Sequence, residues 1–287
     1  MHANTDVFIA RFGCLDDEQW LNVLKRSCLE PVIGDVRFPA FPNAATQQTF
    51  VGSSGEAALQ EAFLFYRDIK QYAQRLGVDI TTTTRILDFG CGWGRNYRFF
   101  LKDVLPSSIV GVDVDVDCVR FCNEHFPMGR FRACDPVPPL LYENDSFDIV
   151  YAYSVFSHLS EDAALRWVRE FARIMRPGGM LIVTTLKQCH LEVWDQIRHT
   201  GTHWASALPN FDISEKKKGF SAGEFLYCPI GGGGVRTPDF YGEAIIPPSY
   251  AERAWAPHFR IVDYFDDPFQ RPQAVLVAQA EDRASRK

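Results

Sequence analysis

Residues that could bind a charged ligand gather in a short run over residues 85–96, which reads Arg-Ile-Leu-Asp-Phe-Gly-Cys-Gly-Trp-Gly-Arg-Asn. Three glycines alternate there, at positions 90, 92 and 94, and Asp88 stands two residues before the first of them. Glycine permits backbone torsions closed to other residues and leaves no side chain between the main chain and a ligand. A carboxylate at this point repels a pyrophosphate but can hold an ammonium group. The run therefore predicts a nucleotide-like ligand that carries a positive charge.

The elements around this run read as strand, glycine turn and helix, which is the opening of a nucleotide-binding βαβ unit. A strand is expected over 86–89 and a helix from Tyr97 through Leu101. The glycine spacing is G-x-G-x-G, whereas a dinucleotide fingerprint has G-x-G-x-x-G and sets a helix N-terminus against a pyrophosphate. A structural glycine turn that binds no ligand is the alternative interpretation.

This stretch closely resembles motif I of the class I S-adenosylmethionine-dependent methyltransferases. The resemblance implies S-adenosylmethionine as the cofactor. It also implies a doubly wound, Rossmann-like α/β fold with a seven-stranded, mostly parallel sheet and a C-terminal antiparallel hairpin. The residues that we assign to cofactor binding are Asp88, Gly90, Cys91, Gly92, Gly94, Asn96, Asp113, Val114, Asp135, Tyr153 and Ser154.

Acidic residues at strand ends supply the expected ribose and adenine contacts. Asp113 ends a predicted strand over 109–113, where a carboxylate can accept hydrogen bonds from both ribose hydroxyls with its two oxygens. Asp115 competes for this role, but it stands where a helix N-cap belongs. By the resemblance, Asp135 after a predicted strand over 129–134 meets the adenine amine, although the Pro-Val-Pro-Pro that follows departs from the usual form.

Further landmarks of the family follow in order. They are a fourth strand (147–152), a helix capped by Ser160, a Pro-Gly-Gly turn (177–179), a fifth strand (180–185) and a closing hairpin of two strands (259–265 and 274–280). The resemblance is strong over residues 85–185 and weak in the amino-terminal and late segments. Because open α/β sheets bind ligands at the carboxyl ends of their strands, the loop over 153–159 is expected near cofactor and acceptor.

His158 in this loop is the candidate general base, since imidazole titrates near neutrality. The alternative is that His158 caps or packs without doing chemistry, in which case His190, His199, His203 or His258 could be the base. Tyr153 and Phe156 could wall the methyl group or the adenine, and Trp93 is expected to stack on the cofactor or on a covering arm. His199-x3-His203 has a helical metal-like spacing, but Gly201 interrupts it and no carboxylate partner is evident, so no metal is expected.

The segments outside the motif region are expected to serve the core domain. Residues 1–80 are predicted to form an irregular arm with a short helix from Asp16 to about Cys28 and a long helix over 53–76, capped by Ser53 and Glu56. The apolar segment over 38–52 is either a lid or a packing arm, placed near the cofactor. Residues 81–287 are predicted to form the methyltransferase domain, in which 187–257 is an insertion that shapes the acceptor pocket. Within it a helix is expected near 191–199, and both the lysine run 216–218 and the glycine run 231–234 are expected in loops.

Composition limits the partners. The 287 residues include 46% hydrophobic and 23% charged positions, which is ordinary for a globular protein, and the net charge of −6 disfavours nucleic acid. Eight cysteines show no C-x-x-C pair and no zinc spacing. Residues 1–11 do not read as a signal peptide, and no run reaches the roughly 20 apolar residues of a membrane span. We expect a cytoplasmic protein that binds neither nucleic acid nor membrane, of unknown oligomeric state.

Two functions stay open from the sequence. The first is methyl transfer to a small-molecule or glycan acceptor, at oxygen or possibly nitrogen, by in-line displacement. The second is a methyltransferase-like fold that binds or regulates without catalysis. A nicotinamide-dependent oxidoreductase is a third interpretation of the glycine turn. No sequence motif identifies the acceptor.

Overall fold

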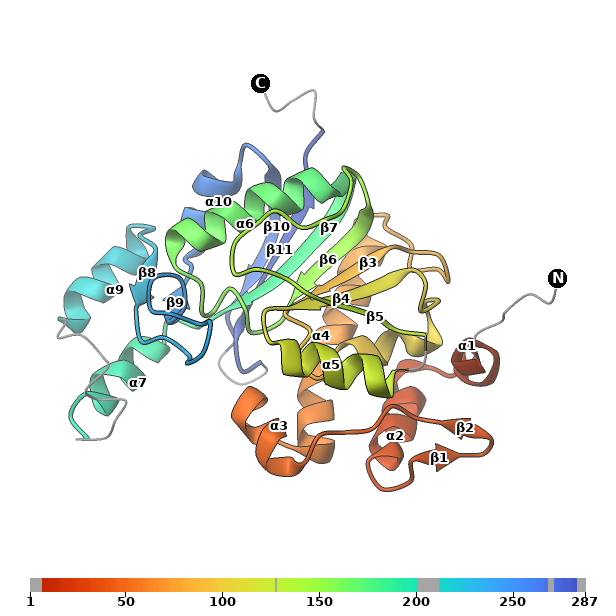
Figure 1. The fold of residues 1–287 in the computed structure, drawn as a ribbon. Helices are drawn as coiled ribbons and strands as arrows, with labels where there is room; N and C mark the ends of the chain where they lie inside the picture. The colour runs from red at the N-terminus through yellow and green to blue at the C-terminus, as the bar shows by residue number, and fades with distance from the viewer. Residues whose placement is uncertain (1–6, 127, 201–211, 268–270, 283–287) are drawn as a thin grey trace. The chain divides into compact units, whose positions relative to one another are not determined.

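The computed structural model describes residues 7–126, 128–200, 212–267 and 271–282, and it contains a seven-stranded sheet (Figure 1). The strand order is β10-β11-β7-β6-β3-β4-β5, which confirms the predicted doubly wound α/β fold class. By their contacts the residues fall into two compact units. Unit 1 holds Met1–Cys134 and Phe147–Tyr151, and unit 2 holds Asp135–Ser146 and Ala152–Lys287. The division into 1–80 and 81–287 stays a prediction.

The parallel part of the sheet belongs to unit 1, except for Ala152 at the end of β6. Its strands are β3 (Ile86–Phe89), β4 (Ile109–Asp113), β5 (Arg130–Ala133) and β6 (Phe147–Ala152). In the register, Ile86 of β3 lies between Ile109 of β4 and Ile149 of β6. All residues of β3 and β4 are buried, as expected for strands covered on both faces. The carboxyl ends of these strands carry the glycine run and Asp113.

The helix predicted after the glycine run is instead a six-residue 3₁₀ helix, η1 (Tyr97–Lys102). Its side chains are all buried, so it is held by packing rather than by helical propensity. The next helix, α5 (Val116–His125), begins at Asp115, whose side chain accepts from the backbone N–H groups of Asp117 and Cys118. This confirms Asp115 as the N-cap. The α5 helix packs against β4 and β5.

The amino-terminal part of unit 1 is more regular than predicted. It contains α1 (Val7–Phe12), α2 (Asp17–Ser27), a hairpin of β1 (Val32–Ile33) and β2 (Val36–Arg37), α3 (Ala44–Val51) and α4 (Gly55–Arg75). The predicted α2 is confirmed, with a capping box between Asp16 and Gln19. The predicted capping box of Ser53 and Glu56 is wrong. Ser54 is the N-cap, and Ser53 Oγ is buried without a partner, because Gly55 with φ of +57° sets the entry to α4.

Antiparallel strands form the sheet part of unit 2. They are β7 (Met175–Thr185), β11 (Ala274–Ala280) and β10 (Phe259–Phe265), so the predicted C-terminal hairpin is confirmed. The fifth strand begins five residues earlier than predicted, since the Pro-Gly-Gly turn lies inside β7 with Gly178 at φ +74°. The helices α6 (Glu161–Ile174) and α10 (Pro248–Trp255) pack against β7, β10 and each other.

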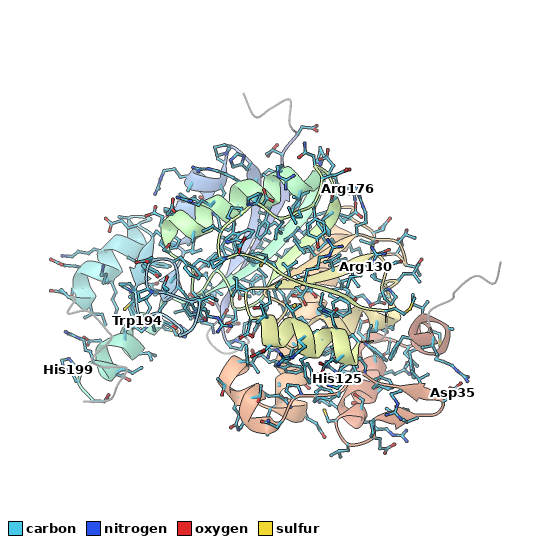
Figure 2. All side chains as sticks on the ribbon, viewed as in Figure 1. Asp35, His125, Arg130, Arg176, Trp194 and His199 are labelled. Atoms are coloured by element: carbon cyan, nitrogen blue, oxygen red, sulfur yellow. The ribbon has the colours of Figure 1, made fainter. Side chains whose placement is uncertain are left out.

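The predicted insertion of unit 2 contains α7 (His190–Ile197), α9 (Ile213–Ser221), β8 (Leu226–Cys228) and β9 (Glu243–Ile245). Its apolar core is shared by Leu191, Trp194 (labelled in Figure 2) and Leu226. The lysine run 216–218 lies in α9, so its assignment to a loop was wrong. The glycine run forms a hydrogen-bonded turn in which Gly232 donates to Arg236 and Gly231 to Tyr241. Gly201 and His203 lie outside the described residues. None of the described helices has the length and apolarity needed to cross a bilayer.

Candidate functional site

The glycine loop between β3 and η1 is tied down by its own backbone. The N–H groups of Gly90 and Cys91 both donate to the Val112 carbonyl, at 2.8 and 3.0 Å, and that of Gly94 donates to Cys91. Gly90, Gly92 and Gly94 all have positive φ, so each adopts a conformation that favours glycine. A pyrophosphate cradle needs free backbone donors at a helix N-terminus. Here these donors are already used and the helix is a short 3₁₀ turn, which argues against a dinucleotide.

Asp113 is the residue that joins the glycine loop to β4. Its Oδ2 accepts from the Gly92 N–H at 2.8 Å, and its Oδ1 accepts from the Asp115 N–H at 2.8 Å. A carboxylate oxygen has two lone pairs and can accept more than one hydrogen bond. The structure thus brings together two residues that the sequence predicted as cofactor-binding, Asp113 and Gly92. The half-buried Val114 follows directly.

Asp88 lies beneath this loop and is 1% exposed. Its Oδ2 makes no hydrogen bond of ordinary geometry in the described part of the chain, although the Tyr151 hydroxyl is close enough to affect it. Burial raises the pKa of Asp88 to about 8, and the charge of Asp113 raises it further, while Tyr151 and Arg95 oppose the rise. A ligand ammonium group would supply both a donor and a countercharge. The orphaned oxygen therefore fits the positively charged end of S-adenosylmethionine.

Two other side chains of the loop also lack partners. Asn96 Oδ1 and Trp93 Nε1 are both buried, and neither makes a hydrogen bond within the described residues. Trp93 contacts Phe41 of the amino-terminal segment, with ring centroids 5.9 Å apart. The predicted position of the apolar segment 38–52 beside the glycine loop is thus observed. Whether this segment acts as a lid stays a prediction.

A buried arginine anchors the same segment. The Arg98 guanidinium is 0% exposed and lies 4.0 Å from the Phe41 ring centroid and 5.2 Å from that of Trp93. It donates to the carbonyls of Pro39 and Ala40 at 3.3 Å each. Burial lowers the pKa of Arg98 to about 10. Aromatic faces and carbonyls therefore stabilise a cation in η1, which no sequence pattern around Arg98 had indicated.

Cys91 of the loop faces Cys122 of α5. Their sulfur atoms lie 3.8 and 3.3 Å from the Gly92 carbonyl oxygen. The hydrogen bond with Cys122 and burial both raise the pKa of Cys91 well above its usual value. The Cys91 thiol is thus a protonated packing group, in accord with the expectation that the cysteines in strands and helices behave as small hydrophobes.

In unit 2, the loop after β6 begins with a closed set of hydrogen bonds. Ser154 has φ of +59°, and its N–H donates to Thr184 Oγ1 at 2.7 Å. Gln273 Nε2 donates to Ser154 Oγ at 2.9 Å, and Thr184 Oγ1 donates to Gln273 Oε1 at 2.5 Å. A non-glycine residue in this conformation marks a constrained position. Ser154 is therefore held by Thr184 of β7 and by Gln273, which directly precedes β11, and Tyr153 before it is buried.

His158 stands at the end of the same loop. Its Nδ1 lies 2.8 Å from the Gly242 carbonyl oxygen, and its ring stacks on Tyr241, with centroids 4.9 Å apart and planes at 12°. A carbonyl oxygen only accepts, so we assign the ring hydrogen to Nδ1. Nε2 then carries the lone pair, as a general base requires. Phe156, which the sequence offered as a wall, is buried against Phe171 and Trp255.

The other predicted site residues in the described part of the chain differ in their burial. His190 at the start of α7 has a buried Nδ1 without a partner among the described residues, and burial lowers its pKa. His199 is exposed, and His258 donates its backbone N–H to Trp255. Asp135 is also exposed. No cluster of three or more metal-ligating side chains occurs in the described residues.

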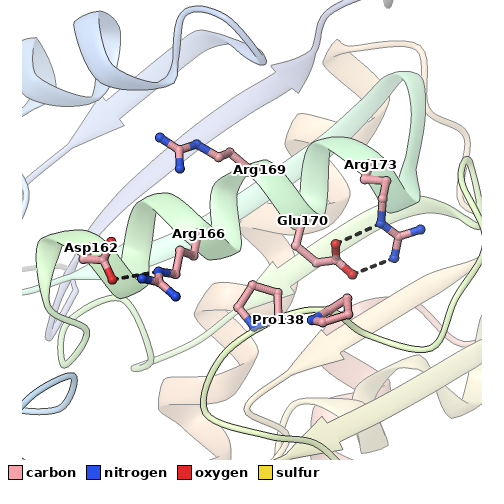
Figure 3. Close-up of a pocket in the computed structure, with 7 residues that line it drawn as sticks. Pro138, Asp162, Arg166, Arg169, Glu170 and Arg173 are labelled. Atoms are coloured by element: carbon pink, nitrogen blue, oxygen red, sulfur yellow. Dashed lines mark hydrogen bonds and ion pairs between the residues drawn. The ribbon is translucent and has the colours of Figure 1, made fainter.

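A separate, open cavity of about 580 Å³ lies on α6 (Figure 3) and contains none of the predicted site residues. Arg166 pairs there with Asp162, and Arg173 with Glu170. Arg173 also donates to the carbonyls of Tyr142 and Leu140, so it fastens the preceding loop to the helix. Ion pairs and loop contacts therefore account for Arg166 and Arg173, two of the arginines that line this cavity.

Part of the chain is similar to known methyltransferases. A family model described as a methyltransferase domain matches residues 86–179. Phosphoethanolamine N-methyltransferase 3 of Arabidopsis thaliana is 27% identical over 50% of this chain and 26% of its own length. The 2-methyl-6-phytyl-1,4-hydroquinone methyltransferase of Synechocystis sp. is 30% identical over 40% of this chain and 36% of its own. The chain thus matches about a quarter to a third of the length of these relatives.

A solved structure has the same fold over most of the chain. It is the 1,6-didemethyltoxoflavin-N1-methyltransferase of Burkholderia thailandensis, with a TM-score of 0.50, 16% identity and coverage of 93% of this chain and 92% of the other. The parallel strands, the glycine loop and Asp113 define a Rossmann-like nucleotide-binding class. Within that class, the match of residues 86–179 to a methyltransferase-domain family, together with the curated relatives, supports a class I S-adenosylmethionine-dependent methyltransferase domain with S-adenosylmethionine as its cofactor.

Proposed function

We propose that the protein transfers the methyl group of S-adenosylmethionine to a small-molecule or sugar acceptor, at a hydroxyl oxygen. The observation that carries the proposal is the loop of unit 1. There Asp113 anchors the glycines, and a buried Asp88 oxygen lacks a donor. The bound cofactor would supply a methyl group on a sulfonium, which is a good leaving group. The protein has to bind, align and exclude water.

Each residue has a proposed task in this reaction. Asp113 is proposed to accept hydrogen bonds from the ribose hydroxyls with its carboxylate oxygens, and Asp88 to pair with the ammonium group. The glycines let the main chain approach the cofactor without a side chain between them. Asp135 and Tyr153 are proposed to contact the adenine, and Ser154 to donate its hydroxyl hydrogen to the ligand.

His158 is proposed to accept the proton of the acceptor hydroxyl at Nε2. A positioned general base contributes roughly 10²- to 10⁴-fold to rate. We expect His158→Ala to lower turnover by about 100-fold or more, while S-adenosylmethionine affinity changes less than about twofold, because no cofactor role is assigned to this ring. Turnover measured with labelled cofactor and affinity measured by calorimetry test this. His199→Ala, at an exposed histidine, is the control, and full activity in His158→Ala would remove His158 as the base.

Nitrogen is the alternative acceptor atom, because one relative is named a phosphoethanolamine N-methyltransferase. An alkyl amine is protonated at neutral pH and also has to lose a proton before it attacks. A base is thus useful for both acceptors, and hydroquinone and phosphoethanolamine serve as the two defined probes. Preference for the amine would correct the acceptor atom and keep the chemistry.

The test of the proposal is transfer of a labelled methyl group from S-adenosylmethionine into a size-fractionated cell extract, with Gly94→Ala as the inactive control. Label in the small-molecule or glycan fraction, absent in the control, is the expected result. Label in protein or nucleic acid would overturn the acceptor class. Cofactor binding without transfer to any fraction would favour a binding or regulatory protein. Failure to bind the cofactor would overturn the proposed function.

A further inference from the structure

The loop after β6 is joined to the insertion by a ladder of main-chain hydrogen bonds. The N–H of Gly242 donates to the His158 carbonyl at 2.7 Å, and that of Ala244 donates to Ser157 at 2.7 Å. The N–H of Ser160 donates to the Phe240 carbonyl at 2.8 Å. The backbone of His158 is therefore fixed on both sides by a segment about eighty positions away in the sequence.

The imidazole of His158 is held as firmly as its backbone. The Gly242 carbonyl holds Nδ1, and the Tyr241 ring covers one face of the imidazole. A Cβ atom at position 242 would lie 2.0 Å from the Cys228 carbonyl oxygen, so a glycine is required where the two main chains approach. Arg236 lies over Tyr241 at 6.0 Å. These contacts preorganise the ring before any ligand arrives.

Glu243 supplies a charge beside this ring. Its Oε1 lies 3.4 Å from His158 Nδ1, and its side chain is 15% exposed. Among the described residues Glu243 forms an ion pair with no lysine or arginine. Its other titratable neighbours are His190 and Cys228. Burial lowers the pKa of His190, and the charge of Glu243 opposes that shift. Burial raises the pKa of Cys228, and the charge of Glu243 adds to that shift. A largely buried carboxylate is stable when a cation or a hydrogen-bond donor compensates it. The Nδ1–H of His158 is the donor at hand.

We propose that Glu243 is a positioning residue that, with the Gly242 carbonyl, keeps the hydrogen of His158 on Nδ1 and the lone pair on Nε2. This inference rests on the proposed function and names part of its machinery. It implies an acceptor that must lose a proton, such as a hydroxyl. The acceptor proton moves to Nε2, the acceptor oxygen bonds the methyl carbon, and the sulfur keeps the electron pair of the broken bond. The resulting imidazolium then lies beside the Glu243 carboxylate.

The test is ¹⁵N NMR of histidine-labelled full-length protein at about pH 8.5, where an ordinary imidazole is neutral. The His158 signals are assigned by their loss in His158→Gln. We expect the Nδ1–H tautomer in the wild type. In Glu243→Gln its excess over the Nε2–H tautomer should fall by about fivefold or more, because the attraction of the carboxylate for the Nδ1 hydrogen is lost and the amide can donate to Nδ1. Glu243→Asp should restore the excess in part.

The control is Glu252→Gln, which removes the same charge from an exposed position of α10 and should leave the tautomer unchanged. An Nε2–H tautomer in the wild type, or an unchanged ratio in Glu243→Gln, would overturn the assignment of Glu243. Where a probe acceptor is methylated, Glu243→Gln should lower kcat by about tenfold or more with little change in KM, and an unchanged kcat would also overturn it. Failure of wild-type protein to bind S-adenosylmethionine would instead overturn the proposed function, since the tautomer is measured without cofactor or acceptor.

Discussion

The glycine loop of unit 1 and the histidine loop of unit 2 differ in which of their polar groups have partners within the protein. In unit 1 the backbone is satisfied, but buried side-chain atoms of Asp88, Trp93 and Asn96 lack hydrogen-bond partners among the described residues. In unit 2 the ring of His158 is held by a carbonyl, a stacked tyrosine and a carboxylate. The first loop has polar groups to which a ligand would supply hydrogen-bond partners. The other has its reactive group placed in advance.

This difference shows which interactions depend on a ligand. An unpaired polar atom in the protein interior costs roughly 1–3 kcal/mol, and a ligand that supplies the partner recovers that free energy as affinity. A prearranged base needs no such ligand, and its benefit appears in the rate. Substitutions in the glycine loop should therefore change cofactor affinity and stability, whereas substitutions around His158 should change turnover.

Of the substitutions in the glycine loop, Gly94→Ala is expected to change stability and cofactor binding most. Gly94 has φ of +78°, and an added Cβ would lie 2.5 Å from the Phe126 ring. We expect the free energy of unfolding to fall by about 2–4 kcal/mol from backbone strain and overpacking, and cofactor binding to be lost. Chemical denaturation and calorimetry measure the two. Gly52→Ala is the matched control, because Gly52 has φ of +72° and open space around it, and it should bind the cofactor normally.

A smaller effect is expected from Asp113→Ala. The substitution removes the acceptor for Gly92 and Asp115 and the proposed ribose contact. We expect S-adenosylmethionine affinity to fall by about 1–3 kcal/mol, or roughly 5- to 150-fold, as measured by calorimetry. Asp115→Ala, which removes the N-cap of α5, should lower stability by about 1 kcal/mol and leave the affinity unchanged. Equal affinities in wild type and Asp113→Ala would contradict the ribose assignment.

The smallest effect concerns pH. Burial raises the pKa of Asp88 from 3.8 to about 8, so the folded protein without cofactor keeps a proton that the unfolded chain releases. Its contribution to stability is full below about pH 4 and is lost as the pH rises through about 8. Asp88→Asn should remove this dependence and raise Tm by about 3 °C or more at about pH 9, while it weakens cofactor binding. Thermal melts across pH test this, with exposed Asp117→Asn as the control. A parallel decline of Asp88→Asn and wild type would refute it.

The sequence predicted the local features of the fold well. The strands over 109–113, 147–152, 259–265 and 274–280 were predicted with the bounds that the structure shows. Each is marked by an apolar run between turn residues, which is a signal within a few positions. The contact of Asp113 with the glycine loop also follows from local order, since β3 and β4 are consecutive and adjacent.

Features that depend on distant contacts were not predictable. Burial of every side chain in Tyr97–Lys102 favours a tight 3₁₀ turn over the helix expected from periodicity. The cage around Arg98 needs Phe41, which lies more than fifty positions earlier. Glu243 had no visible signal, because its role depends on the pairing of its strand with the loop of His158. Propensity and spacing describe neighbours in sequence, whereas these contacts arise from packing.

The ladder between Ser157–Ser160 and Phe240–Ala244 has a consequence for the order of folding. The contacts that shape the glycine loop join residues about twenty positions apart, such as Gly92 and Asp113. The contact of the His158 ring with the Gly242 carbonyl closes a loop of more than eighty positions. Closure of a longer loop costs more chain entropy and comes later. During synthesis, the cofactor loop can therefore form while the ribosome still holds the strand that completes the base.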